Sequence, residues 1–265
     1  MSKTYKGDVT GNVVELNLLD AIEGTLPNLG TPTVVTRNTG PNDVTQVVGD
    51  ITSSSGFQGN AAIKGLVIGT SCTSIGYYAF DSCSGLTGSL VIPDSVTSIG
   101  SYAFNYCSGL AGSLTIPDSV TAIGNNAFDS CSGFNGTLTI GNSVTSIGSF
   151  AFGLCGGLTG SLTIPDSVTS IGNGAFYQCF GLTGSLTIPD SVTSIGSDAF
   201  RSCTSITALY TNTPAASWIG SNALVSTTAL VNIYEGPDVT GQYSATFQGG
   251  SGMTVSAWTN YPNIP

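Results

Sequence analysis

The amino-acid sequence predicts a β-rich solenoid of about seven 24-residue repeats, with a capping segment at each end. Three observations support this prediction. A cysteine, an isoleucine and an Ala-Phe pair each recur at a constant step of 24 residues. Each repeat is too short to bury its own apolar face, so neighbouring repeats must stack and share one core. Only 8% of the 265 residues are charged and 40% are hydrophobic, and Gly, Ser and Thr dominate the rest, which is typical of strands and turns.

The register of the repeat divides the chain into four segments. One unit reads L-x-I-P-D-S-V-T-S-I-G-x-x-A-F-x-x-C-x-G-L-T-G-S, and seven units span residues 66–233. The last of them, "WIGSNALVSTTALVNI", diverges from the consensus, and residues 42–65 form a degenerate first repeat. Residues 1–41 and 234–265 have no period. We therefore expect an N-terminal cap or attachment segment over 1–41 and a C-terminal cap over 234–265.

Within one unit, the pattern predicts the elements in order. Residues 161–164, Ser-Leu-Thr-Ile, alternate polar and apolar side chains, as in a short parallel strand with one buried face. Pro165 ends this strand, and Asp-Ser follows as turn chemistry. The apolar side chains of Val168 and Ile171 return to the core. In residues 175–179, Ala, Phe and Cys have the spacing of one helical or 3₁₀ turn.

The consensus L-x-I-P-x-x-V-T-x-I-G-x-x-A-F-x-x-C-x-x-L resembles the BspA-type leucine-rich repeats of bacterial and protozoan surface proteins. The resemblance is close over 66–233 and weak over 42–65, where Asn60 takes the cysteine site, as the family allows. It implies a leucine-rich repeat solenoid, curved, with a role in adhesion and protein–protein contact. This chain has one extra residue before the strand. We expect a bulge or turn to absorb it at Gly88, Gly112, Gly136, Gly160 and Gly184.

The cysteine column is predicted to be structural. Stacking places neighbouring thiols about 5 Å apart at Cα, but parallel side chains that point into a core do not converge on a disulfide. Without histidine, a zinc site would need four converging thiolates, which a single column does not supply. We therefore expect inert core packing, and we interpret Cys72 as a substitute in the valine column. The column comprises Cys83, Cys107, Cys131, Cys155, Cys179 and Cys203.

Two polar columns allow alternative interpretations. Aspartates recur after the proline, where turn capping is the main prediction and calcium binding the alternative. They are Asp94, Asp118, Asp166 and Asp190, interrupted by Asn142. Hydroxyl side chains also recur at alternate positions of the strand. They could form a regular ice-binding grid, or they could simply be polar residues that suit exposed strand positions. They occupy the pairs Ser89/Val91, Ser113/Thr115, Thr137/Thr139, Ser161/Thr163 and Ser185/Thr187.

The positions that vary between copies flank the Ala-Phe pair, and they contain aromatic residues. Exposed aromatic side chains are enriched at protein contact sites. Tyr78, Tyr102 and Tyr106 are expected to be neighbours on adjacent repeats, and drift at tolerant surface sites is the alternative explanation. The candidate partner-binding residues are Tyr78, Tyr102, Tyr106, Phe150, Tyr177 and Phe180.

Composition argues against several classes of function. The formal net charge is −10, with five basic residues, so nucleic-acid binding and anionic membranes are disfavoured. The start of the sequence lacks the apolar run of a secretory signal, and no stretch approaches the roughly 20 apolar residues of a membrane span. Without histidine there is no Ser-His or Cys-His pair, and no P-loop or dinucleotide motif is present. We expect no enzyme and no cofactor.

The sequence therefore predicts a non-enzymatic interaction or adhesion module that displays a surface to a protein or surface glycan. The expected setting is extracellular, on a cell surface or on a virion. A structural or decoration protein of a capsid, tail, filament or sheath, with no host ligand, is the alternative, and ice binding is a minor one.

Overall fold

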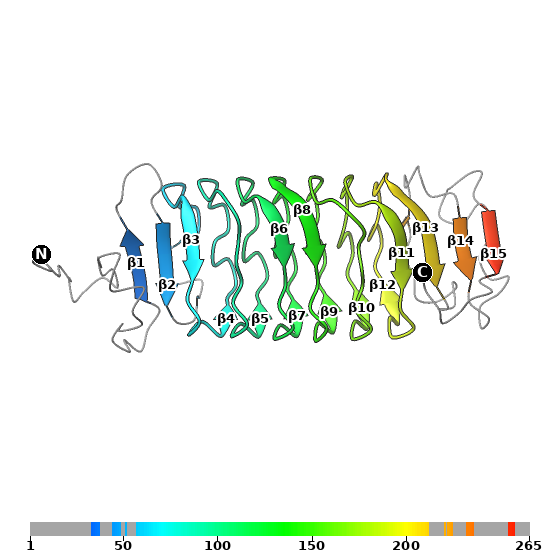
Figure 1. The fold of residues 1–265 in the computed structure, drawn as a ribbon, viewed down its shortest axis with the longest axis horizontal. Helices are drawn as coiled ribbons and strands as arrows, with labels where there is room; N and C mark the ends of the chain where they lie inside the picture. Colours follow the sequence, from blue (N-terminus) through cyan, green and yellow to red (C-terminus); the bar gives the residue numbers. More distant parts are fainter. Residues whose placement is uncertain are drawn as a thin grey trace, which may run out of the picture.

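The structure, a computed structural model, describes residue 51, residues 57–211, residue 220 and residues 222–224. It also describes the backbone of four strands, β1 (Thr33–Arg37), β2 (Val44–Val48), β14 (Asn232–Glu235) and β15 (Thr254–Ala257). About six coils stack along the longest axis of the molecule (Figure 1). The parallel solenoid with a 24-residue period is thus confirmed. Most of the predicted seventh repeat and of both caps lies outside the described residues.

One side of the solenoid is a sheet of two-residue strands, one from each coil. Its strands pair in parallel in the order β4-β5-β7-β9-β10-β12, and each isoleucine lies beside the isoleucine 24 residues away, as in Ile147 beside Ile171. All the isoleucines are buried, so the sheet closes one side of the core. The strands are β4 (Ser74–Ile75), β5 (Ser98–Ile99), β7 (Ala122–Ile123), β9 (Ser146–Ile147), β10 (Ser170–Ile171) and β12 (Ser194–Ile195).

A second side carries the longer strands predicted from the L-x-I pattern, in separate groups. β2 pairs with β3 (Gly65–Ile68), β6 (Gly112–Thr115) with β8 (Phe134–Thr139), and β11 (Gly184–Ile188) with β13 (Ile206–Thr211), all in parallel. β13, β14 and β15 continue in parallel, whereas β1 pairs antiparallel with β2. In the repeat at 161–164 the strand is reduced to the isolated bridge Thr163↔Thr187.

The extra residue of each unit is absorbed as predicted at four of the five glycines. Gly88, Gly112, Gly160 and Gly184 have φ between +76° and +82°, which glycine adopts at little cost. The strand register shifts after Gly112 and after Gly184, as expected of a β-bulge. Gly136 differs, because its φ is not positive and a Cβ there would lie 2.7 Å from the backbone nitrogen of Ser113.

The helical or 3₁₀ turn predicted at Ala-Phe-x-x-Cys is wrong, because the described coils form a series of β-turns there. The N–H of Ala79 donates to Gly76 O, three residues back, at 3.3 Å. The next N–H, of Phe80, instead donates to Ala103 O of the following coil at 2.7 Å. In a 3₁₀ helix every N–H would bond within its own coil. Here alternate N–H groups join neighbouring coils, so this third side is also a ladder.

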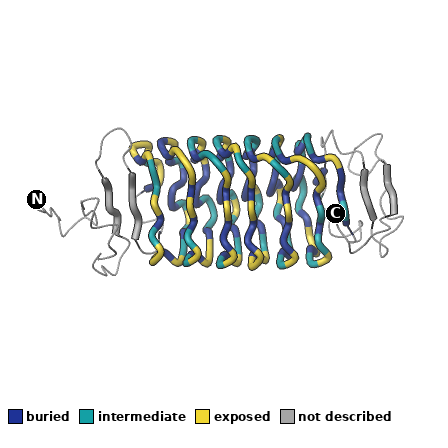
Figure 2. Tube along the Cα trace, viewed as in Figure 1, coloured by how far each residue is buried: buried dark blue, intermediate teal, exposed yellow. Residues whose placement is uncertain are grey.

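Columns of identical side chains fill the core, and the buried residues recur as dark blue stretches in each coil of Figure 2. The phenylalanines form one stack, with neighbouring ring centroids 5.0–5.5 Å apart and interplanar angles of 1–20°. Every coil meets the same environment above and below, so one side-chain shape fits at each level. The stack comprises Phe57, Phe80, Phe104, Phe128, Phe152, Phe176 and Phe200.

Candidate functional site

The residues that vary between coils lie together on the side formed by β-turns, which we call the turn face. It comprises residues 76–84, 100–108, 124–132, 148–156, 172–180 and 196–204. Two positions of each coil on this face have a left-handed backbone, the residue before Ala-Phe and the second residue after it. At Tyr78 and Ser82, for example, φ is 56° and 58°. The repeat therefore imposes the same unusual conformation on these two columns in every coil.

Large side chains occupy several of these left-handed positions. The conformation costs an L-residue roughly 1–2 kcal/mol, least for Gly, Asn and Asp. Some coils use those residues, such as Asn126, Gly174 and Asp198. Others carry bulky residues with φ of 52–59°, namely Tyr78, Tyr102, Tyr106, Phe150 and Leu154. The backbone alone does not favour aromatic or aliphatic side chains there.

Tyr77, Tyr78 and Tyr102 form one group of rings on the turn face, the tyrosine cluster, in which Tyr77 is exposed and the other two are half-buried. The Tyr78 and Tyr102 rings stack with centroids 4.7 Å apart, and the Tyr77 ring stands edge-on to both, at 4.0 and 5.9 Å. The structure thus brings the predicted neighbours Tyr78 and Tyr102 together and adds Tyr77, which is 52% exposed. A hydrogen bond with Tyr77 is the main cause that raises the pKa of Tyr78 to about 12. Tyr106 is 56% exposed and lies outside the described ring contacts of this cluster.

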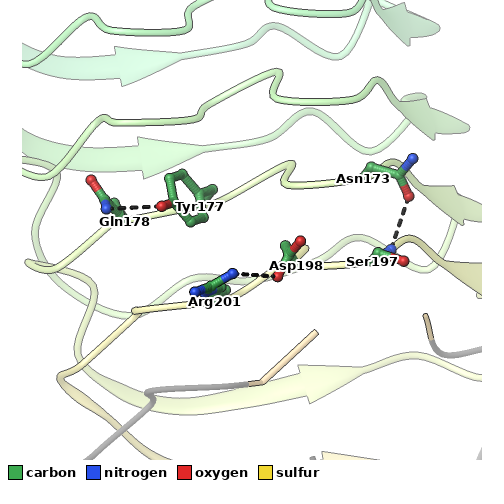
Figure 3. A network of polar contacts seen from close by, with 6 residues as sticks. All are labelled: Asn173, Tyr177, Gln178, Ser197, Asp198 and Arg201. Carbon is green, nitrogen blue, oxygen red and sulfur yellow. Dashed lines mark hydrogen bonds and ion pairs between the residues drawn. The ribbon is translucent and has the colours of Figure 1, made fainter. Parts of the chain in front are cut away.

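Phe150, Leu154, Tyr177 and Phe180 lie on two neighbouring coils of the turn face, and we call them the C-terminal apolar patch. Tyr177 is half-buried and the other three are exposed. The rings of Phe150 and Tyr177 meet edge-on at 6.1 Å. Phe150 lies against Gly174 of the next coil, where an added Cβ would be 2.7 Å from its Cζ atom. The Gln178 amide donates to the Tyr177 hydroxyl at 3.0 Å (Figure 3). The sequence predicted three of the four members and missed Leu154, which is 37% exposed.

Beyond this patch, residues of the last coil of the turn face make polar contacts. Arg201 forms an ion pair with Asp198 at 3.2 Å, and the Ser197 N–H donates to the Asn173 side-chain oxygen at 2.9 Å (Figure 3). The first contact holds a basic side chain against the surface of its own coil. Its charge is therefore compensated within the turn face.

A buried polar ladder runs along the turn face, and the sequence did not predict it. Asp81, Asn105 and Asp129 follow the core phenylalanines and are only 6–9% exposed. Asn105 donates its amide to Asp81 Oδ1 at 2.8 Å, and Gln58 donates to Asp81 Oδ2 at 3.0 Å. Burial raises the pKa of the Asp129 carboxyl. Oδ1 of Asn105 and Oδ1 of Asp129 have no hydrogen-bond donor among the described residues. The sequence does contain a sign of it, because Asp, Asn and Asp occupy the same position in three successive repeats.

The six cysteines of the column lie in the core as free thiols, fully buried. Each Sγ–H donates to the carbonyl oxygen of the phenylalanine in the preceding coil, over 2.8–3.1 Å, as from Cys131 to Phe104. A cysteine is therefore small enough for the core and still links two coils. Burial is the main cause that raises the pKa of Cys83 to about 11 and that of Cys203 to about 12. Cys72 is buried as well and donates to Ser74 O at 3.3 Å.

We expect the native protein to resist alkylation. A thiol with a pKa near 11 is about 0.1% thiolate at pH 8, and burial excludes the reagent as well. Iodoacetamide at pH 8 should label none of the seven cysteines in the folded protein and all seven in guanidinium chloride, as counted by mass spectrometry. Rapid labelling of most cysteines in the folded protein would contradict this prediction.

The aspartate column lies on the surface, and its neighbouring serines link the coils. Asp94, Asp118, Asp166 and Asp190 are all exposed. Asp118 accepts a hydrogen bond from the Asn142 N–H at 2.7 Å, which is a capping contact between coils. Four serines that follow aspartates donate to carbonyls of the preceding coil at 2.6–2.7 Å. In the described part of the chain, no three His, Cys, Asp or Glu side chains gather as a metal site would require.

The hydroxyl pairs on the strand side do not lie on one continuous sheet. β6 and β8 form a two-stranded sheet and β11 belongs to a different group of strands, and the coil between them is joined to β8 and β11 by the isolated bridges Thr137↔Thr159 and Thr163↔Thr187. Thr137 donates its hydroxyl to Ser113 Oγ at 3.3 Å, whereas Val91, which is 69% exposed, interrupts the hydroxyl pattern. The columns of hydroxyl side chains are therefore irregular on this side.

Comparisons with known proteins identify the family. The model of the BspA type leucine rich repeat region matches six copies, over residues 50–179 and 135–254. No curated protein gives a significant match. None of the described residues belongs to a helix that could span a membrane.

Several solved structures are similar to this chain. A leucine-rich repeat protein from Bacteroides ovatus is 21% identical, over 96% of this chain and 74% of that one, with a TM-score of 0.47. A leucine rich cell surface protein from Faecalibacterium prausnitzii is 19% identical, over 98% and 94%, with a TM-score of 0.45. The pneumococcal vaccine antigen PcpA is 16% identical, over 80% and 68%, with a TM-score of 0.51, and this likeness concerns the fold alone. Because the family model matches most of the sequence, the chain belongs to the BspA-type leucine-rich repeat family.

Proposed function

We propose that this protein is a non-enzymatic interaction or adhesion module whose turn face binds a protein partner. One observation carries the proposal. Bulky residues, among them Tyr78, Tyr106 and Phe150, occupy backbone positions where Asn, Asp or Gly would cost less, and Tyr106 and Phe150 are exposed there. Unfavourable local conformations that persist in a structure concentrate at functional sites.

The alternative, drift at tolerant surface sites, accounts poorly for this choice of residues. A tolerant left-handed position would collect Asn, Asp, Gly or Ser, as Asn126, Asp198 and Ser202 illustrate in other coils. Aromatic side chains, in contrast, supply large contact areas and dominate binding hot spots. Their grouping into the tyrosine cluster and the C-terminal apolar patch supports a contact surface. Stacked repeats commonly present extended binding surfaces of this kind.

The test exploits the strained backbone. In the triple variant Tyr78→Asn, Tyr102→Asn and Phe150→Asn, we expect an unchanged or higher melting temperature, because relief of about 1 kcal/mol per left-handed site offsets the lost ring contacts. We expect binding to cells or to immobilised surface proteins to be lost. A matched control, Thr97→Ser, Thr121→Ser and Thr145→Ser beside the two-residue strands, should bind as the wild type does. Full binding by the Asn variant would refute the turn face as the contact site.

The same assay tests where the protein acts. We propose that it acts outside the cell, on a cell surface or on a virion. Binding of purified protein to intact cells supports adhesion. Co-purification with capsid, tail, filament or sheath proteins, without any cell binding, would instead favour a decoration protein.

A further inference from the structure

The described part of the molecule carries an excess of negative charge. Residues 57–211 contain seven aspartates and two basic residues, Lys64 and Arg201. Both bases are already engaged, since the Lys64 ammonium donates to Ala61 O at 3.2 Å and Arg201 pairs with Asp198. A partner with positive charge would thus find an acidic surface whose own cations are occupied elsewhere.

One buried carboxylate belongs to the same β-turn as Tyr78, because the N–H of Asp81 donates to Tyr78 O at 3.3 Å. Asp81 follows Tyr78 by three residues on the same coil and is 8% exposed. Among the described residues, the neutral amides of Gln58 and Asn105 donate to its side chain, and they bind the carboxylate without cancelling its charge. Asn105, which donates to this carboxylate, also donates its backbone N–H to Tyr102 O at 3.4 Å, so Asp81 is linked to both coils that carry the cluster.

The rings themselves favour a cation. The face of a tyrosine ring is negative, and it attracts a lysine ammonium or an arginine guanidinium that lies within about 6 Å of the centroid. Tyr77 stands edge-on to the stacked pair of Tyr78 and Tyr102, so the cluster presents rings in two orientations at one place. A buried negative charge close to such rings strengthens their attraction for a cation.

We propose that the tyrosine cluster binds a lysine or arginine side chain of the partner, with Asp81 as the buried counter-charge. The proposal rests on the proposed function and specifies its chemistry. The partner is then a protein with an exposed basic segment. A neutral glycan could also stack on tyrosine rings, but it would gain nothing from the charge of Asp81.

The probe is a fluorescein-labelled decapeptide of alternating lysine and glycine, compared with the same peptide acetylated at every lysine. We expect fluorescence anisotropy to show binding of the first peptide at low salt, weakening as salt is raised. Acetylation should reduce the affinity about tenfold, because it removes the cation. Equal binding of both peptides would overturn the proposal.

Four variants distinguish attraction between the rings and a cation from apolar contact and from general attraction to an acidic surface. Replacement of Tyr77, Tyr78 and Tyr102 by Leu keeps apolar bulk but removes the rings, and we expect about a tenfold loss of affinity. Replacement by Phe keeps the rings and should change affinity little. Asp81→Asn should weaken binding while it keeps the shape of the side chain. The control, Val67→Ala with Val91→Ala, removes exposed apolar side chains outside the turn face and should bind as the wild type does.

The outcomes distinguish this inference from the proposed function. If the Leu variant of the tyrosine cluster binds the peptide as well as the wild type does, the acidic surface attracts it without the cluster and the cation site is refuted. If the turn-face Asn variant loses cell binding but no peptide binds the wild type, only the cation chemistry is wrong. Binding of neutral oligosaccharides that is unaffected by Asp81→Asn would identify a glycan site instead.

Discussion

Replacement of Gly148 by alanine should destabilise the protein by about 4 kcal/mol and lower its melting temperature by roughly 10 °C. Gly148 follows the last residue of β9, and a Cβ there would lie 2.6 Å from both Asn125 N and the carbonyl carbon of Gly124. These atoms belong to the backbone of the preceding coil, so no side chain can turn aside to make room. The two coils would have to separate, at the expense of the hydrogen bond from Gly148 N to Ile123 O at 2.9 Å.

A second glycine provides the control, because it is constrained for a different reason. Gly88 has a φ of +81°, and a Cβ there would meet no atom within 4 Å. Gly88→Ala should therefore cost only the conformational penalty of a left-handed residue, about 1 kcal/mol. Urea denaturation followed by circular dichroism compares the two variants. Similar losses of stability in both would mean that close packing of the coils is not what requires Gly148.

The repeat made most of this fold predictable from the sequence. A constant step of 24 residues places Phe128 beside Phe104 and Phe152, whatever the path of the chain between them. The core columns and the parallel pairing follow from the period alone. The bulges at Gly112 and Gly184 could be predicted as well, because the extra residue and the glycine occur at the same position.

The local conformation at Ala-Phe-x-x-Cys could not be predicted in the same way. A helical turn and a series of β-turns place apolar side chains at similar spacings, so Ala175, Phe176 and Cys179 fit both. What decides is whether alternate N–H groups bond within the coil or to its neighbour. That depends on the distance between coils and leaves no trace in the pattern of apolar residues.

The candidate site was predicted in part. Tyr78, Tyr102 and Phe150 were predicted because they are aromatic and occupy positions that vary between repeats. Tyr77 was missed, although it contacts the other two rings of the tyrosine cluster. The left-handed backbone of these positions was also not foreseen, because most residues there, tyrosine included, give no sign of positive φ. The ladder at Asp81 escaped notice since polar residues at variable positions suggest solvent exposure.

The protein should lose stability steeply as the pH rises above about 9, because of the cysteine column. An unfolded thiol titrates near pH 8.5, whereas burial raises the pKa of Cys83 to about 11 and that of Cys203 to about 12, and raises those of the four thiols between them. Between these values the unfolded chain releases protons that the native chain retains, so stability is fully present below pH 8.5 and falls as the pH rises. Each thiol contributes about 1.4 kcal/mol per pH unit and six contribute about 8. This is comparable with the whole stability of a typical domain.

The slope of stability against pH separates this effect from other alkaline titrations. Urea denaturation between pH 7.5 and 10.5, with a reductant present, gives the free energy of unfolding at each pH. In the variant Cys107→Ala, Cys131→Ala and Cys155→Ala, the lost hydrogen bonds and the cavities lower the stability at pH 7.5. Its dependence on pH above 9 should nevertheless be about half as steep, because three of the six thiols no longer titrate on unfolding. The tyrosines are the same in both proteins, so an unchanged slope would mean that they, and not the buried thiols, cause the alkaline loss of stability.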